Sequence, residues 1–206
     1  MISAETLSNK IGNYLQRELN IDDIKKSIII YGSFAILQIG ISIIFTVIIG
    51  YLTNTLVESL IITFSIVLLR KYSGGHHAST PNKCLVFGLI ITIIPAILIK
   101  NYIYNIDVNF LLLVSSIIMF CSFLIIIKKA PVDNPNKRIK KEEKRFKLRR
   151  SSIFILSIYL LIILVLIGIY YKYSVDTAII YMACIIYAAG WQSFTLTKLA
   201  ARVINI

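Results

Sequence analysis

Six long apolar runs dominate this sequence and restrict what the chain can fold into. The runs span residues 28–52, 54–69, 84–99, 108–127, 151–171 and 175–197. Several are rich in Ile and Val, which favour strands in water, but a bilayer core is crossed by roughly 20 helical residues. Lipid offers no hydrogen-bond partners, so a spanning backbone must satisfy its own polar groups. The runs therefore predict an all-α integral membrane protein with six transmembrane helices.

The overall charge of the chain is +12, which raises the question of nucleic-acid binding. Charged residues make up 16% of the sequence, against about a quarter in a soluble domain. The basic residues lie between the apolar runs and do not form a basic domain of their own. We therefore expect the charge to reflect membrane topology, with membrane lipids as surroundings and no nucleic acid as partner.

The Lys and Arg residues in the short loops predict the orientation of the chain. The first loop has none, the loop 70–83 has three, and the segment 128–150 has eleven. The third and fifth loops each have one basic residue, Lys100 and Lys172, balanced by an aspartate. Since positive loops stay on the cytoplasmic side, we expect both termini and the segments 70–83 and 128–150 to be cytoplasmic.

The segment before the first apolar run has the pattern of an amphipathic helix. Leu7, Ile11, Tyr14, Leu15 and Leu19 recur at helical spacing. Such a helix lies on the inner leaflet or packs on the protein's own cytoplasmic loops. We expect one membrane domain over the whole chain. Its parts are this interfacial helix (1–27), four transmembrane helices (28–127), a basic cytoplasmic loop (128–150), and two further transmembrane helices with a tail (151–206).

The polar segment 70–84, "RKYSGGHHASTPNKC", contains both histidines of the chain and ends at Cys84. The Gly74-Gly75 pair permits a tight turn. Thr80 suits a helix N-cap and Pro81 the first helical position. Cys84 would then lie in the first turn of a helix, where the helix dipole favours a thiolate.

A thiolate with a neighbouring imidazole is the combination that covalent catalysis uses. On a continuous helix His77 and Cys84 would be about 10 Å apart, so the loop must fold back to bring them together. The spacing permits a Cys–His dyad, while a structural cysteine and a solvated histidine are the ordinary alternatives. No third ligand accompanies the His76-His77 pair, so we expect neither a metal nor another cofactor.

The segment 70–84 resembles the signature of the accessory gene regulator B (AgrB) family. The matching residues are Arg70, Gly74, Gly75, His77, Ala78 and Cys84, and the stretch "APVDNPNKRI" resembles the family's cytoplasmic loop. The resemblance implies a thiol protease of the bacterial cell membrane, multi-pass, with its active site on the cytoplasmic side. Such a hydrolase processes the propeptides of quorum sensing.

The resemblance also implies a role for each matching residue. Cys84 would be the nucleophile and His77 its general base, forming a thioester with the propeptide so that an internal thiol can close a thiolactone autoinducing peptide. The propeptide would have an amphipathic N-terminal part and an acidic C-terminal tail. Arg70, Gly74 and Gly75 would support the site.

The basic segment 128–150, which begins with Lys128 and Lys129, has a net charge of +8. It would attract the acidic tail of a propeptide, and anionic lipids equally. Arg70 would engage a peptide carboxylate or a loop carbonyl, or would simply be a cytoplasmic charge. Asp133 is a candidate third catalytic group.

The intramembrane carboxylate of Glu58 needs a partner, and Gln192, Lys172 or a neighbour in a homodimer could supply it. Two alternatives to the peptidase remain. One is a peptide carrier or exporter with Glu58, Gln38 and Gln192 along a path and Pro95 as a kink. The other is a non-enzymatic membrane scaffold whose basic loop recruits a partner.

Overall fold

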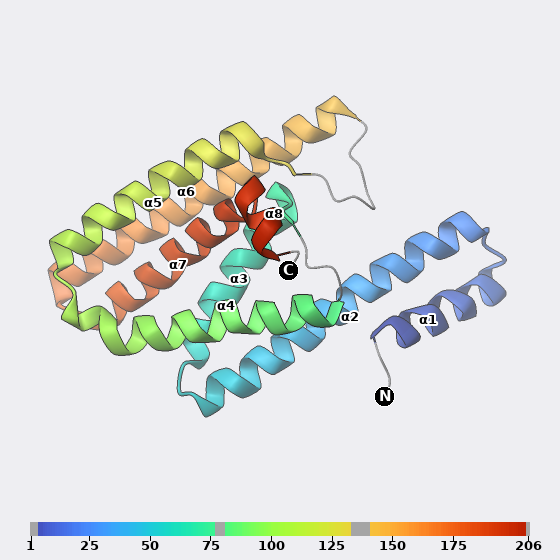
Figure 1. Cartoon of the computed structure of the whole chain (residues 1–206), viewed down its shortest axis with the longest axis horizontal. Helices are drawn as coiled ribbons and strands as arrows, with labels where there is room; N and C mark the ends of the chain where they lie inside the picture. Colours follow the sequence, from blue (N-terminus) through green and yellow to red (C-terminus); the bar gives the residue numbers. More distant parts are fainter. Residues whose placement is uncertain (1–3, 77–80, 133–140, 205–206) are drawn as a thin grey trace. The chain divides into compact units, whose positions relative to one another are not determined.

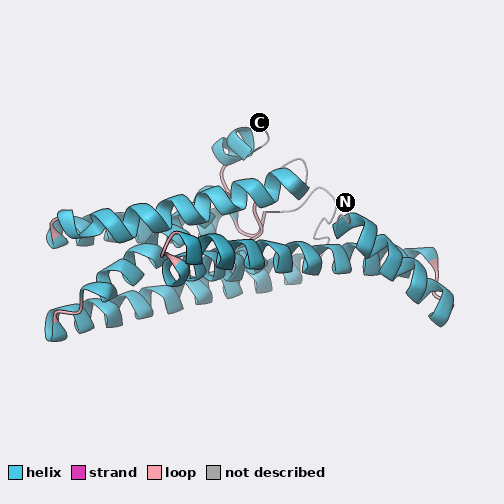
Figure 2. Cartoon of the chain, turned by 90° about the horizontal axis from the view of Figure 1, so that it is seen from below, coloured by secondary structure: helices cyan, strands magenta, loops and turns pink. Residues whose placement is uncertain are grey.

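A computed structural model describes residues 4–76, 81–132 and 141–204 of the chain. These residues are almost entirely helical and are joined by short loops (Figures 1 and 2). The elements are α1 (Ala4–Leu19), α2 (Asp23–Leu52), α3 (Leu56–Ser73), α4 (Pro81–Tyr102), η1 (Ile103–Asn105), α5 (Val108–Lys129), α6 (Glu142–Tyr173), α7 (Asp176–Phe194) and α8 (Lys198–Ile204). The predicted all-α class is confirmed.

Among the residues that the structure describes, five helical segments are long and apolar enough to cross a membrane: α2, Asn82–Asn105, α5, α6 and α7. The second predicted span corresponds to α3, whose 18 residues extend about 27 Å. Because α3 includes Glu58, Arg70 and Lys71, its crossing of the membrane stays a prediction, as does the orientation of the termini.

Both ends of the segment 70–84 are helical. Residues 70–73 form the last turn of α3, and residues 81–84 form the first turn of α4. The apolar run 84–99 was expected as the third span, but α4 extends beyond it at both ends and has 22 residues. The polar residues at both ends of that apolar run continue the helix, so hydropathy alone underestimates its length.

The chain divides into two compact units, Met1–Phe45 and Thr46–Ile206. In the first unit α1 packs on α2 through Gly12, where an added Cβ would lie 2.2 Å from Cγ1 of Ile30. The side-chain amide of Gln16 donates a hydrogen bond to Asp23 at 2.8 Å. Tyr14 and Leu19, from the predicted apolar face, are each 63% exposed. The contact on α2 is therefore made by small residues, and the interfacial location of α1 stays a prediction.

Helix α7 is the central element of the second unit, where it packs against α3, α5 and α6 (Figure 1). Small residues such as Ala183, Ala188 and Ala189 are buried along it. At Gly190 an added Cβ would lie 2.9 Å from Cγ2 of Ile118. Small residues let membrane helices approach closely, which explains how α7 can pack against several helices at once.

A hydroxyl from α7 compensates for the proline inside α4. Pro95 has no N–H group, so the carbonyl of Ile91 lacks its usual helical partner. The hydroxyl of Tyr187 donates to that carbonyl at 2.9 Å. One turn before Pro95, the residue at which the sequence predicts a kink, α4 is therefore hydrogen-bonded to α7.

Candidate active site

The Gly74-Gly75 pair makes a sharp turn directly after α3. Gly74 has φ +69° and Gly75 has φ +138°, both in the region that side chains disfavour. A Cβ at Gly74 would lie 2.2 Å from the carbonyl oxygen of Val132, and a Cβ at Gly75 would lie 2.8 Å from Oγ1 of Thr195. Both positions therefore require glycine for conformation and for space.

Arg70 lies in the last turn of α3, one residue after the predicted second span, and its side chain reaches the backbone of this turn. Its Nη2 donates a hydrogen bond to the carbonyl of His76 at 2.5 Å. Its Nε is buried and has no hydrogen-bond partner among the residues described. Burial lowers the pKa of Arg70, and a thiolate at Cys84 raises it. Since arginine remains protonated in proteins, a guanidinium charge lies within electrostatic range of Cys84.

The C-terminal end of α7 holds the turn from the other side. Gln192 is fully buried, and its Nε2 donates to Oγ of Ser73 at 3.0 Å and to the carbonyl of Gly74 at 2.8 Å. The backbone N–H of His76 donates to the carbonyl of Thr195 at 3.2 Å. These hydrogen bonds fix the backbone up to the residue before His77. Sequence analysis placed Gln192 as a partner for Glu58 or on a transport path; its amide binds the glycine turn, so the pairing with Glu58 was wrong, and the transport path stays a prediction.

The beginning of the basic segment 128–150 also lies against the turn. The N–H of Val132 donates to the carbonyl of Ser73 at 3.0 Å, and Val132 forms a parallel β-bridge with Gly74. From α6, Arg149 donates to the carbonyl of Ala130 at 2.7 Å, and Arg145 donates to the following carbonyl at 3.4 Å. These two arginines therefore fold the backbone that follows α5.

Lys128 and Lys129, the last residues of α5, are both exposed. They stand just before the stretch that contacts the glycine turn. Four further basic residues of the segment are exposed on or beside α6: Lys141, Lys144, Lys147 and Arg150.

Cys84 is the fourth residue of α4 and is partly exposed. The helix does begin at Pro81, as the sequence predicts. His77, Thr80 and Asp133 lie outside the described residues, so the dyad geometry and the third catalytic group stay predictions. The structure brings Arg70, Gly74 and Gly75 of the motif together with the backbone of His76, which is not one of the matching residues.

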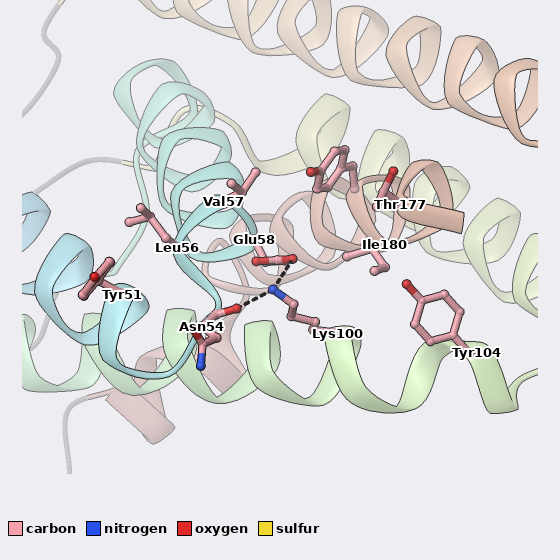
Figure 3. Close-up of a pocket in the computed structure, with 10 residues that line it drawn as sticks. Tyr51, Asn54, Leu56, Val57, Glu58, Lys100, Tyr104, Thr177 and Ile180 are labelled. Atoms are coloured by element: carbon pink, nitrogen blue, oxygen red, sulfur yellow. Dashed lines mark hydrogen bonds and ion pairs between the residues drawn. The ribbon is translucent and has the colours of Figure 1, made fainter. Parts of the chain in front are cut away.

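Glu58 has a partner that sequence analysis did not identify. It forms an ion pair with Lys100 at 3.2 Å, and the ammonium of Lys100 also donates to the carbonyl of Asn54 (Figure 3). The proposed partners Gln192 and Lys172 were wrong. Charge alternation places the loops around Glu58 and Lys100 on the same side of the membrane, and this signal could have suggested the pair.

A family model and the similar proteins both point to the same family. The family model of accessory gene regulator B matches residues 8–196. An AgrB-like protein of Clostridium perfringens strain SM101 is 40% identical over 195 residues, which cover 94% of this chain and 91% of that protein. AgrB-like protein 2 of Clostridium perfringens strain 13 is 38% identical over 194 residues, with the same two coverages. No solved structure matches this chain.

Proposed function

Since the chain belongs to the accessory gene regulator B family, which takes part in quorum-sensing peptide processing, we propose that it is a membrane cysteine endopeptidase. Its substrate is a propeptide that loses an acidic C-terminal tail. The observation that carries this proposal is that Cys84 lies in the first turn of α4 while Arg70, within electrostatic range of it, binds the carbonyl of His76. A positive charge and a helix N-terminus both stabilise a thiolate.

The reaction begins when His77 accepts the proton of the Cys84 thiol. The thiolate attacks the carbonyl carbon of the peptide bond before the tail, and His77 returns the proton to the leaving amine. The tail departs and the remaining peptide is held as a thioester on Cys84. A cysteine thiol within that peptide then attacks the thioester carbonyl. This closes the thiolactone and restores the Cys84 thiol, so one thioester replaces another.

Arg70 supports this chemistry in two ways. Its hydrogen bond to the carbonyl of His76 constrains the residue next to the proposed base. Its charge lies within electrostatic range of Cys84, where it would stabilise the negative charge that develops during the attack.

Gln192 and Thr195 are positioning residues in the same proposal. Their hydrogen bonds fix the positions of Ser73, Gly74 and His76, so the backbone direction at His76 is defined. A nucleophile and base that must meet across a folded-back loop need such a fixed starting point.

The exposed lysines at the start of the segment 128–150 suit an acidic tail. Lys128 and Lys129 precede the stretch that contacts the glycine turn, so a tail attracted to them lies near the proposed nucleophile. The guanidinium groups of Arg145 and Arg149 stabilise the fold, since they donate hydrogen bonds to the backbone carbonyls of Pro131 and Ala130.

The test is cleavage of the cognate propeptide, followed by mass spectrometry after co-expression. We expect Cys84→Ala to abolish cleavage and His77→Ala to slow it by about 10²- to 10⁴-fold, the usual contribution of a general base. Cys121→Ala removes an exposed cysteine elsewhere and should cleave normally. Wild-type protein should also accumulate a peptide adduct that hydroxylamine releases. Normal cleavage by Cys84→Ala would refute the peptidase proposal.

A further inference from the structure

A cavity of about 380 Å³ lies in the second unit, around Glu58 and Lys100 (Figure 3). Its walls come from the end of α2, the start of α3, the end of α4 and the start of α7. Cys84 and Lys100 both lie on α4, 16 residues and therefore about 24 Å apart along the helix axis. The volume falls within the roughly 300–1,000 Å³ typical of pockets for small ligands.

The charge inside this cavity is neutralised by the protein itself. Glu58 is 5% exposed and pairs with Lys100, whose side chain is 39% exposed. In the described structure Lys100 uses two of its three ammonium protons, on Glu58 and on the carbonyl of Asn54. One donor therefore remains for a ligand, without a net charge to attract an anion.

The remaining walls are aromatic and apolar. Tyr51 and Tyr104 are exposed at the cavity, Tyr181 lines it as well, and Val57 and Ile180 supply aliphatic surface. For these three tyrosines, no hydroxyl hydrogen bond is found within the described ranges. Their rings can stack on a flat or apolar group while their hydroxyls donate to or accept from a polar backbone.

We propose that this cavity binds a short uncharged peptide segment, with a backbone carbonyl on the Lys100 ammonium and an aromatic or apolar side chain against the tyrosines. That this segment belongs to the peptide released from Cys84 is an inference that rests on the proposed function. A lipid phosphate suits the cavity less well, because the cation that would hold it is already paired with Glu58. An acidic peptide tail is disfavoured for the same reason.

The binding test uses purified protein in nanodiscs and N-acetyl-phenylalanine methylamide as the probe, observed by saturation-transfer NMR. Val57→Trp fills the cavity from an exposed position, and Val67→Trp is its matched control ten residues further along α3. We expect wild type and Val67→Trp to bind the probe equally. Val57→Trp should bind about tenfold more weakly, which corresponds to about 1.4 kcal/mol of lost contact. The double variant Glu58→Gln/Lys100→Met, which keeps the site neutral, should also weaken binding.

The outcomes separate this proposal from the peptidase. Cys84→Ala should bind the probe as wild type does, because the cavity is remote from the thiol. Equal binding by Val57→Trp and Val67→Trp would overturn the proposal, as would tighter binding of N-acetyl-aspartate methylamide. A co-purified lipid that Val57→Trp alone loses, with no probe binding by wild type, would assign the cavity to lipid and also overturn it. Absence of propeptide cleavage would refute the peptidase and leave the probe result standing.

Discussion

Replacing Gln192 with leucine isolates the contribution of α7 to the proposed active site. The change keeps the approximate size of the side chain and removes the donors to Ser73 and Gly74. Each lost hydrogen bond costs about 1 kcal/mol. The carbonyl of Gly74 keeps a longer hydrogen bond from the hydroxyl of Ser73, at 3.3 Å. The turn before His77 therefore loses about 2 kcal/mol of local stabilisation. If the reactive geometry depends on that turn, kcat falls by about 30-fold.

The assay is cleavage of a synthetic propeptide by protein in nanodiscs, with kcat and KM measured separately. We expect the loss to fall on kcat, because Gln192 contacts the turn and leaves the exposed basic residues unchanged. Ser193→Ala is the matched control. Ser193 is equally buried and adjacent, and its hydroxyl has no hydrogen-bond partner in the described part of the chain.

A second variant keeps the prediction open to refutation if the leucine variant folds poorly. Gln192→Glu has the same shape, but an ionised carboxylate cannot donate to the carbonyl of Gly74. Its kcat relative to wild type should rise as the pH is lowered, because a protonated carboxyl regains one donor. A kcat for Gln192→Leu close to that of Ser193→Ala would refute the positioning role.

Three further predictions concern the turn, the helix contacts and the basic segment. Gly75→Ala should abolish cleavage because of its positive φ and its close contact with α7, whereas Gly168→Ala, which has open space around it, should not. Tyr187→Phe should lower the free energy of unfolding by about 1–3 kcal/mol, measured by denaturant titration in bicelles, since a carbonyl of α4 loses its donor. Replacing Lys128 and Lys129 with Gln should raise KM for a propeptide with an acidic tail, and the difference from wild type should shrink as salt is added.

The helical class was predictable because long apolar runs leave few alternatives in lipid. The extent of α4 was not, because the polar residues that extend it are not distinguished from loop residues by hydropathy. The local features of the motif, the glycine turn and the helix beginning at Pro81, followed from residue type alone. These features depend on backbone preferences over a few residues.

The partners that lie far apart in the sequence could not be predicted in the same way. An amide in an apolar run, such as Gln192, indicates a buried polar contact without naming its partner, which here lies 118 residues away at Gly74. The same holds for Glu58, whose ion-pair partner is at position 100. Such pairings depend on how the helices pack against one another. The periodicity of a single segment carries no information about that packing.

The ionic groups at the two ends of α3 differ in a way that bears on the proposed chemistry. Glu58 and Lys100 neutralise each other, as partly buried charges in a membrane protein usually do. Arg70 has no carboxylate within ion-pair distance in the described ranges, and its one recorded acceptor is a neutral carbonyl. A partly buried cation so placed is stabilised most when an anion forms beside it. In the proposed mechanism the thiolate of Cys84 and the oxyanion that follows its attack would be such anions, and the charge of Arg70 would then stabilise the reacting state more than the resting one.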